Sequence, residues 1–273
     1  MYKVILDPGH GGRDPGAVRE GVKEKDCNLA MAIACRDALR RSGVNAVLTR
    51  ETDKDFVPPD QPWDEDLDLE NRVAVANRIG GDCFVSIHQN AVANPEAHGT
   101  GTYYYPASAK GKVLAQAIQA AVVASLGTYN RGVIPANFYV LHRTTMPAAL
   151  VEVVFLSNPA EREWLKDPAF RRQAGEAIAK GICKYLGVSW VEPKPEPSKE
   201  KKFFPPDPGG SGSGGGTVPD WVREQEDALK ELAEVAKFNT PHKIDETVTL
   251  GLLAVILQRM GALELFKSSR KGG

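Results

Sequence analysis

Residues 2–12 have the sequence YKVILDPGHGG, in which a short apolar run leads directly into a glycine-rich turn. The run from Val4 to Leu6 predicts a buried strand, and His10 stands in the turn at its end. The glycines beside His10 offer no side chains to pack against, so we expect this histidine to hold a ligand. Glu24 follows as an isolated carboxylate just before a predicted helix.

Two further apolar runs carry polar side chains of the same kind. Residues 85–87 predict a second buried strand, which ends on His88, and residues 148–156 predict a third, with Glu152 in its middle. Burying an unpaired polar group costs about 2–7 kcal/mol, and more for a charge, so Glu152 needs a functional reason to be there. Because ligands bind at the carboxyl ends of strands in open α/β sheets, we expect these groups to meet at one edge.

The remaining periodicity completes an α/β fold. Helical spacing predicts helices over residues 26–41, 69–79, 110–126, 160–165 and 168–186, and further strands are predicted over 44–49, 100–105 and 137–142. Strands that alternate with helices predict a mostly parallel sheet of about six strands with helices on both faces. The segment 53–68 is rich in proline and acidic residues and is predicted to be an exposed loop, with the lining of a substrate cleft as the alternative.

The chain has 273 residues, of which 42% are apolar and 25% charged, and this leaves room for one large domain and a small one. We predict a catalytic domain over residues 1–187, a linker rich in Pro, Gly and Ser over 188–217, and a small α-helical module over 218–273. Two helices make only a small core, so we expect this module to bind a surface or to form a homo-oligomer.

Charge and composition exclude several classes of partner. The formal net charge of -1 gives no footprint for nucleic acid or an anionic membrane, and no window approaches the roughly 20 apolar residues of a membrane span. The N-terminus shows no basic segment followed by an apolar one, so we expect no signal peptide and synthesis in the cytoplasm. The four cysteines form no C-x-x-C pair, which favours a reducing compartment during folding.

The candidate residues fit the chemistry of a hydrolytic metal site. Zinc in such sites takes three N or O protein ligands and keeps a fourth position for water, and His10, Glu24 and His88 form a set of that kind. The metal lowers the pKa of water and polarises the scissile carbonyl. Glu152 would then act as general base and pass the proton to the leaving nitrogen. From the residues alone, we predict metal-assisted hydrolysis.

Several blocks, in order along residues 3–186, resemble the zinc-dependent N-acetylmuramoyl-L-alanine amidases of the Amidase_3 type. They are DPGHGG (7–12), EK (24–25) with NLA (28–30), LTR (48–50), Arg72 with AN (76–77), FVSIHQNA (84–91), and LVE (150–152) with FLSN (155–158). The resemblance implies a twisted six-stranded α/β sheet, zinc ligands at His10, Glu24 and His88, and a catalytic glutamate at Glu152. It also implies cleavage of the amide between N-acetylmuramic acid and the first L-alanine of the peptidoglycan stem peptide.

The resemblance suggests a lytic enzyme whose partner is peptidoglycan and whose helical module targets the cell wall or self-associates. Without an export signal, it is expected to be a phage endolysin or an autolysin that reaches the wall after cell lysis. Val154 departs from the family pattern, in which glycine is common. Only about ten residues separate His88 from the strand after Gly99, and this is too short for the helix that blocks the zinc in septal members. We therefore expect a permanently open site.

Other interpretations stay open at this stage. His142 and His98 could compete as ligands, although a groove or surface role is favoured for both, and Cys27 could be an activated thiol near a helix N-terminus. A zinc peptidase that cuts elsewhere in the stem peptide is the rival enzyme. A wall-binding module with a dead site is the rival outside enzymes.

Overall fold

The structure is a computed structural model, and it describes residues 1–193. Residues 194–217 of the predicted linker and the whole predicted helical module at 218–273 lie outside the described residues. No helix in the described part of the chain is long and apolar enough to cross a membrane.

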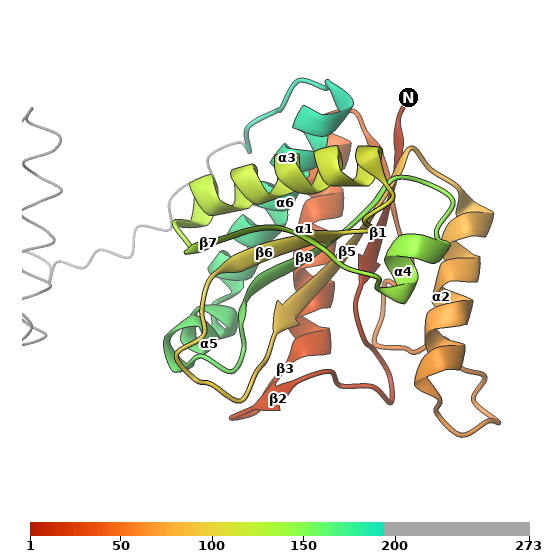
Figure 1. The fold of residues 1–273 in the computed structure, drawn as a ribbon, viewed down its shortest axis with the longest axis vertical. Coiled ribbons are helices and arrows are strands. Elements are labelled where there is room, and N and C mark those ends of the chain that lie inside the picture. Colours follow the sequence, from red (N-terminus) through yellow and green to blue (C-terminus); the bar gives the residue numbers. More distant parts are fainter. Residues whose placement is uncertain (194–273) are drawn as a thin grey trace, which may run out of the picture. The chain divides into compact units, whose positions relative to one another are not determined.

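A six-stranded sheet forms the centre of the described domain (Figure 1). Its strands lie in the order β4-β1-β5-β8-β6-β7, and every neighbouring pair is parallel except β8 with β6. The strands are β1 (Lys3–Pro8), β4 (Asn45–Leu48), β5 (Cys83–Asn90), β6 (Thr100–Tyr104), β7 (Asn130–Pro135) and β8 (Ala148–Phe155). The predicted mostly parallel six-stranded sheet is confirmed.

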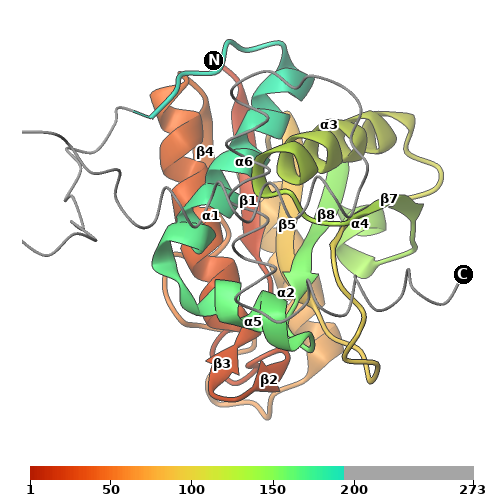
Figure 2. The ribbon, with the colours of Figure 1, turned by 90° about the vertical axis from the view of Figure 1, so that its left-hand side faces the viewer.

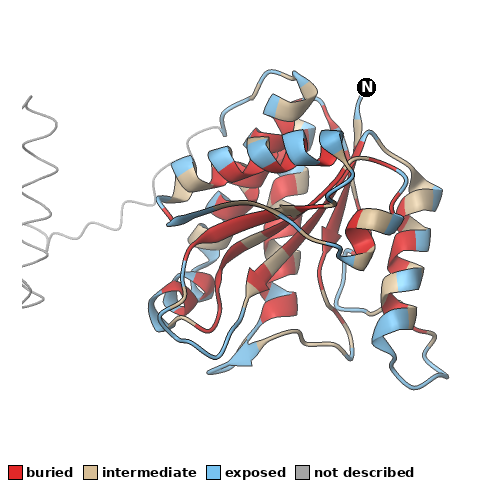
Figure 3. Ribbon diagram, in the orientation of Figure 1, coloured by how far each residue is buried: buried red, intermediate tan, exposed pale blue. Residues whose placement is uncertain are grey.

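Helices cover both faces of this sheet (Figures 1 and 2). On one face, α1 (Glu24–Arg41), α3 (Ala109–Leu126) and α6 (Pro168–Leu186) pack their apolar sides on the larger core cluster. On the other face, α2 (Glu65–Ile79) and α4 (Tyr139–Arg143) pack on a smaller cluster that includes Phe84 and Leu150. A short helix α5 (Pro159–Lys166) and a hairpin of β2 (Val18–Arg19) and β3 (Val22–Lys23) complete the domain. Figure 3 shows the buried residues gathered in the strands and on the inward sides of the helices.

The strand predicted over residues 137–142 is wrong. Residues 139–143 form the short helix α4, and the strand lies earlier, at β7. The aromatic and β-branched residues of α4 favoured a strand, but Val140 and Leu141 are adjacent and both pack in the smaller cluster. A strand would have sent these two side chains to opposite faces, whereas one turn of helix points both at the core. β7 escaped notice because it is an edge strand that contains Gly132 and ends on Pro135.

Helix α2 begins earlier than predicted, at Glu65, so the end of the predicted loop 53–68 is helical. Asp64 caps it, because its side chain accepts a hydrogen bond from the backbone N–H of Leu67. The remaining predicted helices and strands differ from the observed ones mainly at their ends.

The parallel strands place the candidate residues at one edge. β1 and β5 run side by side to Pro8 and Ile87, and the next residue of β5, His88, pairs with Glu152 of β8. His10 follows β1 after one further residue. The topology therefore brings these side chains to the same end of the sheet, as the sequence predicts.

Candidate metal centre

The turn after β1 presents His10 in a conformation that L-residues rarely adopt, with φ of 61°. Two buried arginines from elsewhere in the sequence hold the carbonyl oxygens of this turn. Arg50 donates to the carbonyls of Pro8 and Gly9, both at 3.1 Å. Arg72 donates to those of Pro8 at 2.9 Å and His10 at 3.1 Å. These bonds offset the backbone strain and fix where the His10 side chain begins.

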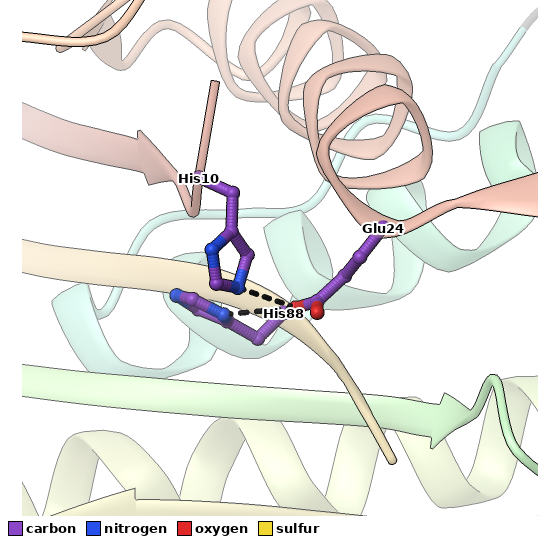
Figure 4. A group of neighbouring side chains, drawn as sticks. All are labelled: His10, Glu24 and His88. Atoms are coloured by element: carbon purple, nitrogen blue, oxygen red, sulfur yellow. Dashed lines mark hydrogen bonds and ion pairs between the residues drawn. The ribbon is translucent and has the colours of Figure 1, made fainter. Parts of the chain in front are cut away.

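Glu24 lies at the first residue of α1 and faces both histidines (Figure 4). Its Oε1 lies 3.2 Å from His10 Nε2 and 3.0 Å from His88 Nδ1. The same oxygen accepts from the backbone N–H of Gln89 at 3.1 Å, and Oε2 accepts from that of Ala17 at 3.0 Å. A carboxylate is favoured at a helix N-terminus, where the backbone N–H groups leave a partial positive charge. Helix and hydrogen bonds thus both hold Glu24 in its ionised form.

His88 comes from the end of β5 and presents Nδ1 to the cluster, because its other edge faces the turn after β1. A Cβ atom at Gly9 would lie 2.1 Å from both Cε1 and Nε2 of the His88 ring. Only glycine fits there, which explains one glycine of the DPGHGG stretch.

One donor atom from each of His10, Glu24 and His88 lies within 4.8 Å of the others, so the three residues could share one metal ion. Two imidazoles and one carboxylate suit zinc, which binds N and O ligands at about 2.0–2.2 Å. They are the residues that the sequence predicts as ligands. Within residues 1–193, no other group of His, Cys, Asp and Glu converges in this way.

Asp14 orients His10 from the other side of its ring. Its Oδ2 lies 2.6 Å from His10 Nδ1, which leaves Nε2 to face Glu24. Metal-binding histidines usually have such a carboxylate or carbonyl on their second nitrogen. Sequence reasoning missed Asp14, and its only signal was a carboxylate four residues after His10.

The site is electrostatically coupled when no metal is bound. Burial alone lowers the pKa of His10, but hydrogen bonds to Asp14 and Glu24 outweigh it and raise that pKa to about 10. Burial opposes ionisation of Glu24, whereas its hydrogen bonds to His10 and His88 hold its pKa well below the usual value. His10 is therefore protonated at neutral pH, and a metal ion must displace that proton to use Nε2.

Glu152 stands next to this cluster with a free oxygen. Its Oε2 is fully buried and has no hydrogen-bond partner within the described residues. Burial, followed by the charge of Glu24, raises its pKa to about 8, although His10 opposes the shift. A carboxyl group with a pKa near neutrality can both accept and return a proton.

A cavity of about 250 Å³ opens at these residues. His10, His88 and Glu152 form one side of it. The other side is aromatic and acidic and includes Trp63, Glu65, Leu69, Phe138 and Tyr139. The side chains of Trp63 and Phe138 are each about 40% exposed. Trp63 belongs to the segment 53–68, so this segment does line a cleft in part.

The competing candidates lie elsewhere. His98 is exposed, with Nδ1 2.8 Å from the carbonyl oxygen of Glu96, and His142 sits on α4 against the rings of Tyr105 and Tyr139. Burial raises the pKa of the Cys27 thiol to about 11, so this cysteine is not activated. Between β5 and β6 the described chain forms turns and no helix, as its length predicts.

Comparison with known proteins places the chain in one family. Residues 4–184 match the family described as N-acetylmuramoyl-L-alanine amidase. The germination-specific N-acetylmuramoyl-L-alanine amidase of Bacillus subtilis is 35% identical over 187 residues, which cover 67% of this chain and 79% of that protein. The amidase LytC of the same organism is 37% identical over 185 residues, 67% of this chain but 35% of LytC. The structure of the CwlD amidase from Clostridioides difficile, in complex with the GerS lipoprotein, superposes with a TM-score of 0.66 at 34% identity, covering 68% of this chain and 99% of CwlD.

Proposed function

The chain belongs to the N-acetylmuramoyl-L-alanine amidase family, and we propose that it hydrolyses peptidoglycan with a zinc ion held by His10, Glu24 and His88. The bond cleaved is the amide between N-acetylmuramic acid and the L-alanine of the stem peptide. The observation that carries the proposal is the convergence of these three side chains beside the Glu152 carboxylate, one oxygen of which is buried and has no partner within the described residues.

The donor set supports zinc. His10 Nε2, His88 Nδ1 and one Glu24 oxygen give three N and O ligands, the number found in catalytic zinc sites. Zinc bound there would polarise the scissile carbonyl and lower the pKa of water. Asp14 fixes the His10 ring so that Nε2, rather than Nδ1, is presented.

Glu152 is the proposed general base. Its unpartnered Oε2 can accept a proton from the attacking water, and the raised pKa allows the same group to return that proton to the leaving nitrogen. His88 pairs with Glu152 across neighbouring strands, so the base lies directly beside one proposed ligand.

Substrate access needs no rearrangement in this proposal. The segment between β5 and β6 carries no helix, and the cavity beside Glu152 is open to the surface at Trp63 and Phe138. The enzyme is therefore active without an activator protein. We further propose that residues 1–187 form the catalytic domain, that 188–217 form a linker, and that 218–273 target the wall or self-associate. Delivery as a phage endolysin or as an autolysin released at lysis would serve this activity equally.

Product analysis tests the reaction. Digestion of purified peptidoglycan by the full chain should release peptides with N-terminal L-alanine and create no new reducing sugar ends. New N-termini at other stem residues would favour the rival zinc peptidase and contradict the amidase assignment.

Metal analysis tests the ligands. Chelation should abolish hydrolysis, and zinc should restore it. His10→Ala should lose bound metal, whereas His98→Ala, which removes an exposed histidine outside the cluster, should retain both metal and activity. A His10→Ala protein with a full metal content would contradict the ligand assignment.

A further inference from the structure

We propose that Arg131, on edge strand β7, binds a carboxylate of the leaving stem peptide and so selects acidic stems. This inference rests on the proposed amidase function. It adds where the leaving peptide binds relative to Glu152. Arg131 belongs neither to the metal cluster nor to the residues that line the cavity.

A register shift between β6 and β7 places Arg131 on the same face as Glu152. Glu152 pairs with Gly101 of β6, and Gly101 pairs with Gly132 of β7, whereas Thr100 pairs with Asn130, so Arg131 is an extra residue between the two pairs. A Cβ atom at Gly101 would point to the Glu152 face, and it would lie 3.7 Å from the Cβ of Arg131. The arginine side chain therefore leaves β7 on the face that carries the base.

The guanidinium of Arg131 is held in place while the side chain remains exposed. It lies 4.9 Å from the centre of the Phe155 ring, and its Nη1 donates to the carbonyl oxygen of His98 at 3.2 Å. That bond uses one of five guanidinium N–H donors. Within the described residues no carboxylate forms an ion pair with the group. The charge of Glu161 acts on it, but the two Glu161 oxygens accept the backbone N–H groups of Gly99 and Phe155. An arginine stacked on a ring with donors to spare is suited to a carboxylate ligand.

Tyr103 connects this arginine with the site. Burial and the charge of Glu152 raise the pKa of Tyr103, whereas the charge of Arg131 lowers it, so both charges act on the same hydroxyl.

The chemistry of the proposed reaction assigns the peptide to this side. The residues proposed as ligands come from the β1 and β5 side of the sheet, and Glu152 returns its proton to the nitrogen of the leaving peptide. The cavity that Glu152 helps to line carries aromatic rings, which suit a sugar ring, and the acids Asp14 and Glu65, which repel a carboxylate. Its arginine, Arg72, is already paired with Asp7 and Asp68. The leaving peptide then extends across β6 toward β7.

The distances agree with a carboxylate on the second residue of the stem. Neighbouring strands lie about 4.8 Å apart, so β7 is about 10 Å from β8. Two extended residues span about 7 Å. The side chain of Arg131 closes the remaining gap.

The test uses two muramyl dipeptides that differ only in the second residue, which carries a carboxylate in one and the corresponding carboxamide in the other. The wild-type full chain should favour the carboxylate by about 10- to 100-fold in kcat/KM, the effect of a hydrogen bond to a charged group. Arg131→Met should reduce this ratio to about 1 by raising KM for the carboxylate substrate. Arg131→Lys should recover part of the ratio because it keeps the charge.

Arg143→Met is the matched control, because Arg143 is also exposed and also lies over an aromatic ring, that of Tyr139 in the cavity lining. This variant should keep the wild-type ratio. A wild-type ratio of 1, or a ratio lost in Arg143→Met and kept in Arg131→Met, would overturn the proposal.

Binding of the released dipeptides separates this proposal from the amidase function. Calorimetry should show tighter binding of the acidic dipeptide than of the amide to the wild type but not to Arg131→Met, at equal metal content and melting temperature. Equal binding of the two dipeptides to the wild type would reject the carboxylate site even where hydrolysis is normal. Failure of the full chain, with zinc bound, to release peptides with N-terminal L-alanine from peptidoglycan would instead reject the proposed function.

Discussion

Glu24 and Glu152 are two carboxylates at the same edge of the sheet, but their surroundings are opposite. Both oxygens of Glu24 accept hydrogen bonds, and its Oε1 is also close to both histidines. Glu152 has an oxygen that is buried and unpartnered within the described residues. The pKa of Glu24 is lowered by its partners, and that of Glu152 is raised by burial.

This difference matches two different tasks. A ligand must be ionised and fixed in position before the metal arrives, which requires partners for every lone pair. A base must keep a lone pair free and have a pKa near the working pH, which requires burial without partners.

The largest effect is expected from Glu152→Gln. Loss of a general base lowers the rate by about 100- to 10,000-fold. The metal content should stay at the wild-type level, because Glu152 is not one of the three converging residues. Hydrolysis rates and metal analysis of the same preparation provide the measurement. Wild-type turnover in this variant would assign the proton transfer to another group.

Gly9→Ala should disturb the proposed metal ligands by a steric clash. The new Cβ would lie 2.1 Å from the His88 ring, so the ring must move. A displacement of about 1 Å in such a site costs roughly 100-fold in rate, and here metal affinity should fall as well. Titration with zinc, together with hydrolysis rates, measures both effects.

Gly127→Ala serves as the control for this substitution. Gly127 has φ of 65°, so alanine strains the backbone there, but the added Cβ meets nothing within 4 Å. This variant should lose stability of about 1 kcal/mol and keep its metal affinity. Equal metal affinity in the Gly9 and Gly127 variants would show that the close approach of Gly9 and His88 is not needed.

The sequence predicts the participants of the site better than it predicts what supports them. His10, His88 and Glu152 stand out because each is a polar group beside or within an apolar run, and Glu24 stands out as an isolated carboxylate just before a predicted helix. Their meeting follows from the parallel sheet, whose carboxyl edge collects residues from distant strands. The local pattern is sufficient for these residues because β1, β5 and β8 bring His10, His88 and Glu152 to one edge, and Glu24 stands at the start of α1.

The supporting residues depend on contacts across long sequence separations, which no local pattern shows. Arg50 bonds to carbonyls about 40 positions away, and Arg72 to carbonyls more than 60 positions away. Asp14 is close in sequence to His10, but nothing local indicates that the two side chains meet. The error over residues 137–142 has the same origin, since packing against α2 decided that segment rather than its β propensity.

Asp14→Asn tests the carboxylate that orients the proposed ligand His10. The amide keeps the shape of the side chain but removes the charge that helps to raise the pKa of His10 to about 10. Zinc affinity should fall by about 10- to 100-fold, the usual effect of losing such a partner. Asp37→Asn is the control, because Asp37 is an exposed acid on α1 that contacts Arg36.

The pH dependence of zinc affinity gives a second measurement on Asp14→Asn. In the wild type, zinc must displace the His10 proton at any pH below about 10, so affinity should fall by about tenfold per pH unit as pH is lowered. In the variant this proton competition should begin at a lower pH. Identical pH profiles in the two proteins would show that Asp14 does not act on the His10 ring.

The last effect concerns stability rather than rate or metal affinity, and it comes from the base. In the metal-free protein, the pKa of Glu152 is raised from 4.5 to about 8, so the folded state binds this proton more tightly than the unfolded state does. The stabilisation is complete below pH 4.5 and is lost as pH rises toward 8, at no more than about 1.4 kcal/mol per pH unit. Glu152→Gln has no such proton, so the wild type should lose stability relative to the variant over this range. Urea unfolding of both metal-free proteins at pH 5, 6.5 and 8 measures the difference in their free energies of unfolding. Titration of the groups that the two proteins share largely cancels in this difference. A constant difference would mean that Glu152 is solvated in the folded protein, and the contrast with Glu24 would then disappear.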